Sequence, residues 1–193
     1  MKNHKAAIIH GTGGHPERNW FPWLKEELVN RNIETIVPKF PTPEGQSLTS
    51  WRETFLNEVG PISPDLILFG HSIGAAFVLN LLHRSDTPAK AVFLVAGFLG
   101  KLDKPEFDTL NESFFAEEFD WEKIRNNAKK IFIYAGDNDP YVPLEKGSEL
   151  AKCLKAELVI IPNGGHLNQD SGFKEFPRLI EDLELMLKGV NDL

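Results

Sequence analysis

The amino-acid sequence predicts a single α/β domain over residues 1–193, with about six mostly parallel strands and helices on both faces of the sheet. Short apolar segments rich in β-branched residues alternate with longer amphipathic segments along the chain. The short segments are apolar almost throughout, which is typical of strands covered on both faces. A length of 193 residues with 41% hydrophobic content suits one domain with a substantial core.

The predicted strands are residues 5–10, 34–38, 65–69, 91–95, 130–135 and 157–161. Between them, apolar residues recur at helical spacing. This spacing predicts helices within residues 17–31, 47–59, 75–84, 143–156 and 173–190. Residues 75–84 are almost entirely apolar, so we expect that helix to be buried. Pro177 has to lie in the first turn of the last helix or shorten it.

Residues 97–120 interrupt this alternation with aromatic and acidic residues that follow neither pattern. A helix is predicted to start at Asp120, whose carboxylate suits an N-cap. The stretch before it is long for a plain connection, and such loops often act as lids or binding loops. A lid and an excursion whose aromatic residues pack on the domain both fit the sequence.

Charge and composition exclude several classes of protein. With 21 Lys and Arg against 28 Asp and Glu, the formal net charge is −7. Without a basic cluster, we expect neither nucleic acid nor an anionic membrane as a partner. The single cysteine, Cys153, allows no internal disulfide, and no apolar run resembles a signal peptide or a membrane span. We therefore expect a cytoplasmic protein, and the sequence does not predict its oligomeric state.

The third predicted strand ends in Gly70-His-Ser-Ile-Gly74, and a helix follows directly. This sequence matches G-x-S-x-G between a strand and a helix, a turn that exposes the serine hydroxyl above the sheet. The two glycines let the strand and the helix approach closely. Ser72 is therefore the candidate nucleophile.

A serine nucleophile needs a base and an acid, which in α/β-hydrolases follow it in the order Ser, acid, His. His166 follows the last predicted strand, and no other histidine comes after His83. Asp137 and Asp139 both follow the preceding strand. We favour Asp139 because the rigid segment Pro-Tyr-Val-Pro comes next, and we expect the other carboxylate to bond the turn backbone or face solvent.

Two backbone N–H groups are expected to form the oxyanion hole. One belongs to Ile73, the residue after the nucleophile. The other should come from the loop after the first strand, where Thr12 is the best candidate and Gly13 lies behind it. His10 and His71 are expected to support the two catalytic loops.

A nucleotide cofactor and a metal are not expected. Gly11 and Gly13 begin a G-x-G-x-x-G pattern, but Pro16 stands at its third glycine and no ribose-binding acid follows the next strand. There is no Walker A lysine, and the remaining histidines are too scattered to suggest metal ligands.

Four segments together resemble the small serine hydrolases that include retinoblastoma-binding protein nine and its bacterial, YdeN-like relatives; the segments are residues 10–25, 69–79, 136–143 and 163–168. The resemblance implies a compact α/β-hydrolase with a Ser-Asp-His triad on Ser72, Asp139 and His166. It implies no particular substrate, and the retinoblastoma-binding signature L-x-C-x-E is absent. Hydrolysis of a small ester, thioester or amide is the expected function. The alternative is a non-catalytic interaction module on the same scaffold.

Overall fold

The computed structural model describes residues 4–189, which form one six-stranded sheet in the order β2-β1-β3-β4-β5-β6. All pairings between neighbouring strands are parallel, so the predicted α/β class and all six predicted strands are confirmed. The strands are β1 (Lys5–Ile9), β2 (Glu34–Ile36), β3 (Leu66–His71), β4 (Ala91–Val95), β5 (Ile131–Gly136) and β6 (Leu158–Ile161). Residues 1–3 and 190–193 of the predicted domain, including the end of the predicted last helix, lie outside the described residues.

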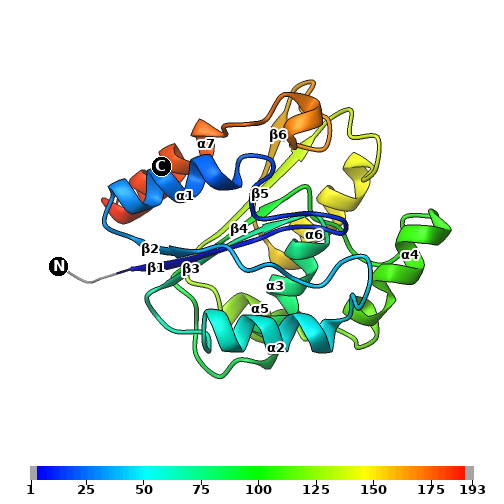
Figure 1. Cartoon of the computed structure of the whole chain (residues 1–193), viewed down its shortest axis with the longest axis horizontal. Helices are drawn as coiled ribbons and strands as arrows, with labels where there is room; N and C mark the ends of the chain where they lie inside the picture. The colour runs from blue at the N-terminus through cyan, green and yellow to red at the C-terminus, as the bar shows by residue number, and fades with distance from the viewer. Residues whose placement is uncertain (1–3, 190–193) are drawn as a thin grey trace.

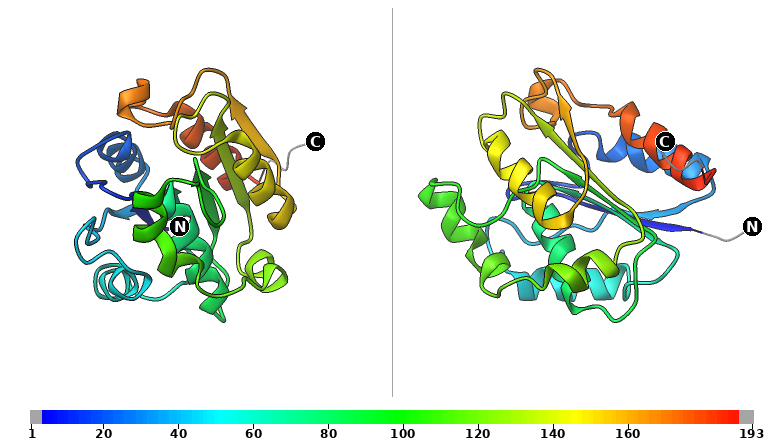
Figure 2. Two further views of the ribbon diagram at one scale, coloured as in Figure 1. Left: turned by 90° about the vertical axis from the view of Figure 1, so that its right-hand side faces the viewer. Right: turned by 180° about the vertical axis from the view of Figure 1, so that it is seen from behind.

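Helices cover both faces of the sheet, as predicted (Figures 1 and 2). On one face, α1 and α7 pack over β1, β3, β4 and β5. On the other face lie α2, α3, α5 and α6. Their bounds are α1 (Phe21–Asn30), α2 (Leu48–Glu58), α3 (Ile73–Arg84), α5 (Trp121–Asn126), α6 (Leu144–Leu154) and α7 (Pro177–Leu187). No helix within residues 4–189 is long and apolar enough to cross a membrane.

Two of these α-helices, α2 and α5, begin with a side-chain cap. The hydroxyl of Ser47 accepts a hydrogen bond from the backbone N–H of Ser50 at the start of α2. Asp120 caps α5 in the same way by accepting from the N–H of Lys123, as the sequence predicted. Pro177 is the first residue of α7, where its missing N–H costs nothing.

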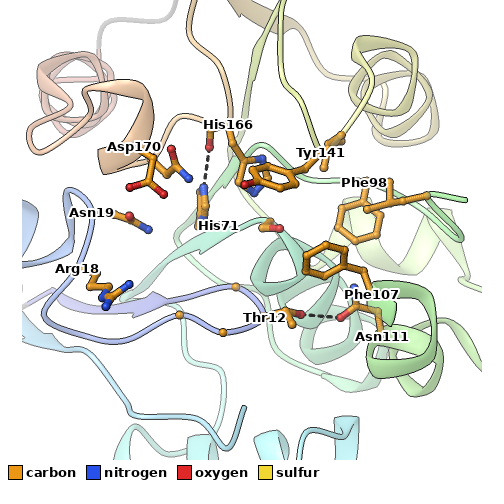
Figure 3. A pocket seen from close by; sticks show the side chains of 17 residues that line it. Thr12, Arg18, Asn19, His71, Phe98, Phe107, Asn111, Tyr141, His166 and Asp170 are labelled. Atoms are coloured by element: carbon orange, nitrogen blue, oxygen red, sulfur yellow. Dashed lines mark hydrogen bonds between the residues drawn. The ribbon is translucent and has the colours of Figure 1, made fainter. Parts of the chain in front are cut away.

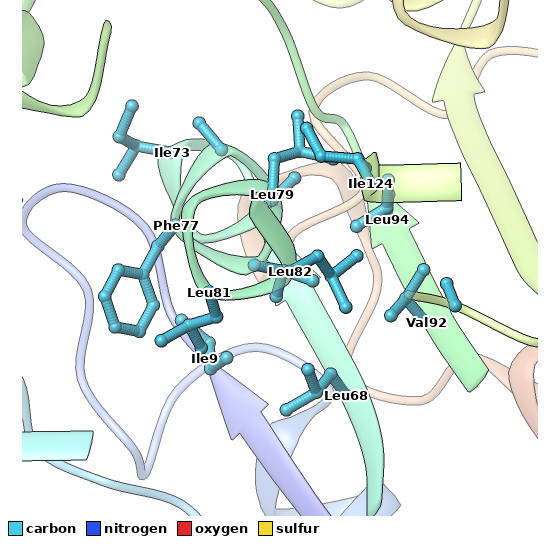
Figure 4. Packing of buried hydrophobic residues seen from close by; sticks show 14 of the residues in the cluster. Ile9, Leu68, Ile73, Phe77, Leu79, Leu81, Leu82, Val92, Leu94 and Ile124 are labelled. Atoms are coloured by element: carbon cyan, nitrogen blue, oxygen red, sulfur yellow. The ribbon is translucent and has the colours of Figure 1, made fainter. Parts of the chain in front are cut away.

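The central helix α3 is the most extensively buried helix (Figure 4). Every residue from Ile73 to Leu82 is buried, so the prediction for residues 75–84 is correct and the helix starts two residues earlier. Phe77 has no exposed surface and packs edge-on against the rings of Phe40 and Trp51. Burial of one such side chain stabilises the fold by about 1.5–3 kcal/mol. The core therefore holds the start of α3 firmly in place.

The excursion at residues 97–120 contains regular structure that the sequence analysis did not identify. It forms α4 (Pro105–Asn111) and a short 3₁₀ helix, η1 (Glu112–Phe115). Phe98 and Phe114 are buried in the main core, which fits the packing interpretation for those two rings. α4 itself lies beyond the carboxyl ends of the strands and is set apart from the other helices (Figure 1).

Candidate active site

The turn between β3 and α3 places Ser72 in a strained backbone conformation. Its φ of 58° and ψ of −125° lie in a region that residues other than glycine rarely adopt. The N–H of Ser72 donates to the carbonyl of Val95 on β4 over 2.9 Å, which ties the turn to the neighbouring strand. The flanking glycines are sterically required: a Cβ on Gly70 would lie 2.6 Å from the carbonyl oxygen of Gly74.

Asp139 and His166 lie in contact at the ends of two later strands. The Nδ1 of His166 is 2.7 Å from Oδ2 of Asp139, and both side chains are largely buried. The other carboxylate oxygen of Asp139 accepts from the backbone N–H groups of Tyr141 and Val142. The Asp139 carboxylate is thus fixed by the turn that follows it and faces Nδ1 of the imidazole.

Asp137 is exposed and accepts a hydrogen bond from the N–H of Asn163 over 2.7 Å. Asn138, which the sequence analysis did not single out, accepts from the N–H of Gly165 over 2.7 Å. Both bonds join the loop after β5 to the loop that carries His166. Asp137 is therefore solvent-exposed, as expected for the other carboxylate, but its hydrogen bond is to the loop after β6 and not to its own turn.

Two buried histidines brace the loops around this site. His71 donates from Nε2 to the carbonyl of His166 over 2.9 Å, and burial lowers the pKa of His71 to about 3. His10 donates from Nδ1 to the carbonyl of Gly11, while its Nε2 accepts from the N–H of Phe40. Burial also lowers the pKa of His10. Both imidazoles are therefore neutral near pH 7 and act as fixed hydrogen-bonding groups.

The loop after β1 forms a tight turn beside Ser72. The N–H of Gly14 donates to the carbonyl of Gly11, and the N–H of Gly13 donates to Oγ1 of Thr42 over 2.7 Å. The N–H of Thr12 has no hydrogen-bond partner within residues 4–189. A Cβ on Gly11 would lie 2.9 Å from the Cβ of Ser72, so only glycine leaves the serine room.

A cavity of about 210 Å³ connects these groups (Figure 3). Ser72, His166 and Thr12 all line it, and Ile73 begins α3 directly behind Ser72. The start of a helix carries a partial positive charge, which suits a developing oxyanion. Three of the five predicted site residues thus line one cavity, while Ile73 follows Ser72 in the chain and Asp139 contacts His166.

The two ends of the cavity differ in chemistry (Figure 3). One end is apolar and is lined by Phe98, Phe107 and Tyr141. None of these three was predicted as a site residue. The ring of Tyr141 packs edge-on against His166 at 5.1 Å between centroids. The opposite end carries Arg18, Asn19 and Asp170. Within residues 4–189, no group of three or more His, Cys, Asp or Glu side chains could hold a metal ion.

Comparison with known proteins identifies the family of the chain. A family model described as serine hydrolase matches residues 6–184. YdeN of Bacillus subtilis strain 168 is 30% identical over 175 residues, which cover 90% of each chain. Serine hydrolase RBBP9 of Rattus norvegicus is 24% identical over 182 residues, covering 93% of this chain and 95% of the relative.

The solved structure of the YdeN gene product from B. subtilis has the same fold. It superposes with a TM-score of 0.88 at 28% identity and covers 96% of this chain and 100% of its own. The resemblance inferred from the four sequence segments is confirmed. The chain has the α/β-hydrolase fold and belongs to the serine hydrolase family.

Proposed function

We propose that the chain hydrolyses small esters, thioesters or amides, with Ser72 as nucleophile, His166 as base and Asp139 as the acid that orients it. The observation that carries this proposal is the 2.7 Å contact between His166 and Asp139 beside a cavity that also holds the strained Ser72. An imidazole held at Nδ1 by a carboxylate keeps the bare Nε2 available as a base.

In the proposed reaction, the Oγ of Ser72 attacks the acyl carbon while Nε2 of His166 takes its proton. The carbonyl oxygen becomes an oxyanion, which the N–H groups of Ile73 and Thr12 stabilise. The intermediate then collapses to an acyl-serine ester, and the leaving group departs with the proton from His166. Water deprotonated by His166 attacks the ester, which releases the acid and restores Ser72.

The cavity supports a small substrate. Its volume of about 210 Å³ is below the roughly 300–1,000 Å³ of typical ligand pockets. The aromatic end, with Phe98 and Phe107, suits a short apolar group. We therefore propose a short acyl chain rather than a long lipid or a polymer.

Labelling with a fluorophosphonate probe tests the proposed nucleophile. We expect the wild type to be labelled and Ser72→Ala to be unlabelled. Ser148→Ala is the matched control and should keep the label, because Ser148 is an exposed serine on α6 that bonds the carbonyl of Leu144. A folded wild type that resists labelling would contradict the proposal and favour the non-catalytic interaction module.

A series of p-nitrophenyl esters from acetate to octanoate tests the proposed substrate size. We expect kcat/KM to be highest for the shortest chains, because a longer chain exceeds the aromatic end of the cavity. A steady rise in kcat/KM up to octanoate would refute the short-chain proposal while leaving the nucleophile assignment intact.

A further inference from the structure

A side-chain hydrogen-bond network joins α4 to the loop that carries Thr12, and Figure 3 shows its bond between Thr12 and Asn111. The Oγ1 of Thr12 donates to Oδ1 of Asn111, the last residue of α4, over 2.8 Å. Gln46, in the loop before α2, donates from Nε2 to the same Oδ1 over 2.8 Å and to Oγ1 of Thr12 over 3.0 Å. Asn111 is only 3% exposed, and its bonds to Thr12 and Gln46 are partly buried.

The same network holds the next residue of the loop. The N–H of Gly13 donates to Oγ1 of Thr42, whose hydroxyl donates to Oε1 of Gln46 over 2.6 Å. Gln46 also donates to the carbonyl of Leu110 on α4 over 3.1 Å. The side-chain amide of Gln46 therefore bonds the hydroxyls of Thr12 and Thr42, and it also bonds α4.

These hydrogen bonds restrict the orientation of the peptide between Gly11 and Thr12. The N–H of Gly13 is occupied by Thr42, and the Thr12 side chain points to Asn111. With both neighbouring groups fixed, the N–H of Thr12 is held in one direction without a partner of its own within residues 4–189. An oxyanion donor works best when such an orientation is set before the reaction.

We infer that Gln46 is a positioning residue for the oxyanion hole, acting through Thr12 and anchored by Asn111 on α4. This inference rests on the proposed function, because it assumes that the N–H of Thr12 meets the oxyanion. α4 then serves as a support for the loop that carries Thr12, through the bonds of Asn111 to Thr12 and Gln46.

The test compares Gln46→Ala with the wild type on p-nitrophenyl acetate. We expect kcat to fall about 10- to 100-fold with KM unchanged, because the lost orientation matters only when the oxyanion forms. The inhibition constant of a small alkylboronic acid, whose serine adduct carries an anionic oxygen, should rise by the same factor. A merely structural role would not separate kcat from KM in this way.

Thr12→Val provides a second, independent variant. It removes the hydroxyl that bonds Asn111 and Gln46 but keeps the backbone N–H. We expect kcat to fall in the same way, and the double variant with Gln46→Ala should fall by less than the product of the two effects. Thr12→Val carries the test alone if Gln46→Ala loses its folded circular dichroism spectrum.

Ser113→Ala is the matched control. Ser113 also joins the excursion to the start of α2, by accepting from the N–H of Leu48 over 3.0 Å, but within residues 4–189 its side chain has no hydrogen bond to the loop after β1. We expect its kcat to equal that of the wild type. An equal loss in Ser113→Ala and Gln46→Ala would overturn the inference and indicate general loosening of the segment.

The failure of this inference and that of the proposed function are distinguishable. If the wild type is labelled at Ser72 and Gln46→Ala keeps the wild-type kcat, only the positioning role is wrong. A rise in KM with kcat unchanged would also overturn it, because Gln46 would then affect binding of the ground state. If the wild type shows neither labelling nor turnover, the proposed function itself is wrong.

Discussion

Because His71 is buried, the free energy of unfolding should depend on pH between the pKa of His71 in the unfolded chain and its pKa in the folded chain. The side chain is 4% exposed, and burial lowers its pKa from 6.5 to about 3. The neighbouring His166 and His10 lower the pKa of His71 further, whereas the carboxylate of Asp139 raises it. Between pH 6.5 and 3 the unfolded chain binds a proton at His71 that the folded chain does not.

The free energy of unfolding should therefore fall as the pH drops through this window. At pH 5, which is 1.5 units below the unfolded pKa of His71, the loss from this group is about 2 kcal/mol. His71→Gln removes the titration but can keep an N–H donor near the carbonyl of His166, which His71 bonds over 2.9 Å. We expect this variant to lose about 2 kcal/mol less than the wild type between pH 7 and pH 5.

Urea unfolding followed by tryptophan fluorescence at the two pH values measures this difference. Other titrating groups act in both proteins and largely cancel in the comparison. An equal loss of stability in His71→Gln and the wild type would refute the assignment of the pH dependence to His71. His71→Gln is expected to be less stable at pH 7, so the pH difference and not the absolute stability is the informative quantity.

Three further predictions follow from the geometry of the site. Asp139→Asn should lower kcat about 10⁴-fold, because an amide facing Nδ1 of the histidine favours the wrong tautomer. Asp137→Asn should leave kcat near wild type in the same ester assay, and the reverse result would exchange the two roles. Gly74→Ala should destabilise the fold by about 3 kcal/mol in thermal unfolding, because its Cβ would lie 2.7 Å from two backbone oxygens of β1 and the residue after it. Gly147→Ala on α6, with 3.2 Å to its nearest neighbour, is the matched control and should change stability by less than about 1 kcal/mol. Phe107→Ala should raise the ratio of kcat/KM for octanoate over acetate about tenfold by opening the apolar end of the cavity, and an unchanged ratio would place the acyl chain elsewhere.

The strands and the serine turn were predictable from the sequence because their signals are local. A buried parallel strand appears in the sequence as a continuous apolar run. Gly70 and Gly74 mark the close approach of strand and helix independently of distant parts of the chain. The order of Ser72, Asp139 and His166 is also readable, since parallel strands bring their carboxyl ends to one edge.

The support of the site was not predictable, because it depends on contacts between distant segments. Gln46 and Asn111 are 65 residues apart and follow no periodic pattern. α4 has seven residues, of which only Asn111 is buried, so it is too short to show a repeated helical pattern of apolar residues in the sequence. Asn138 lies between the two candidate aspartates, yet its bond to Gly165 appears only once the two loops meet.

The placement of α1 and α7 on one face of the sheet bears on how the chain folds as it is synthesised. The opposite face receives its last helix, α6, at residue 154, whereas α7 ends at residue 187. Phe69 and Phe93 on the α1 side pack in the same cluster as α7, and Arg31 after α1 pairs with Glu184 of α7. Among the helices within residues 4–189, α7 is synthesised last, so we expect nascent chains to expose aromatic core surface on this face until α7 leaves the ribosome.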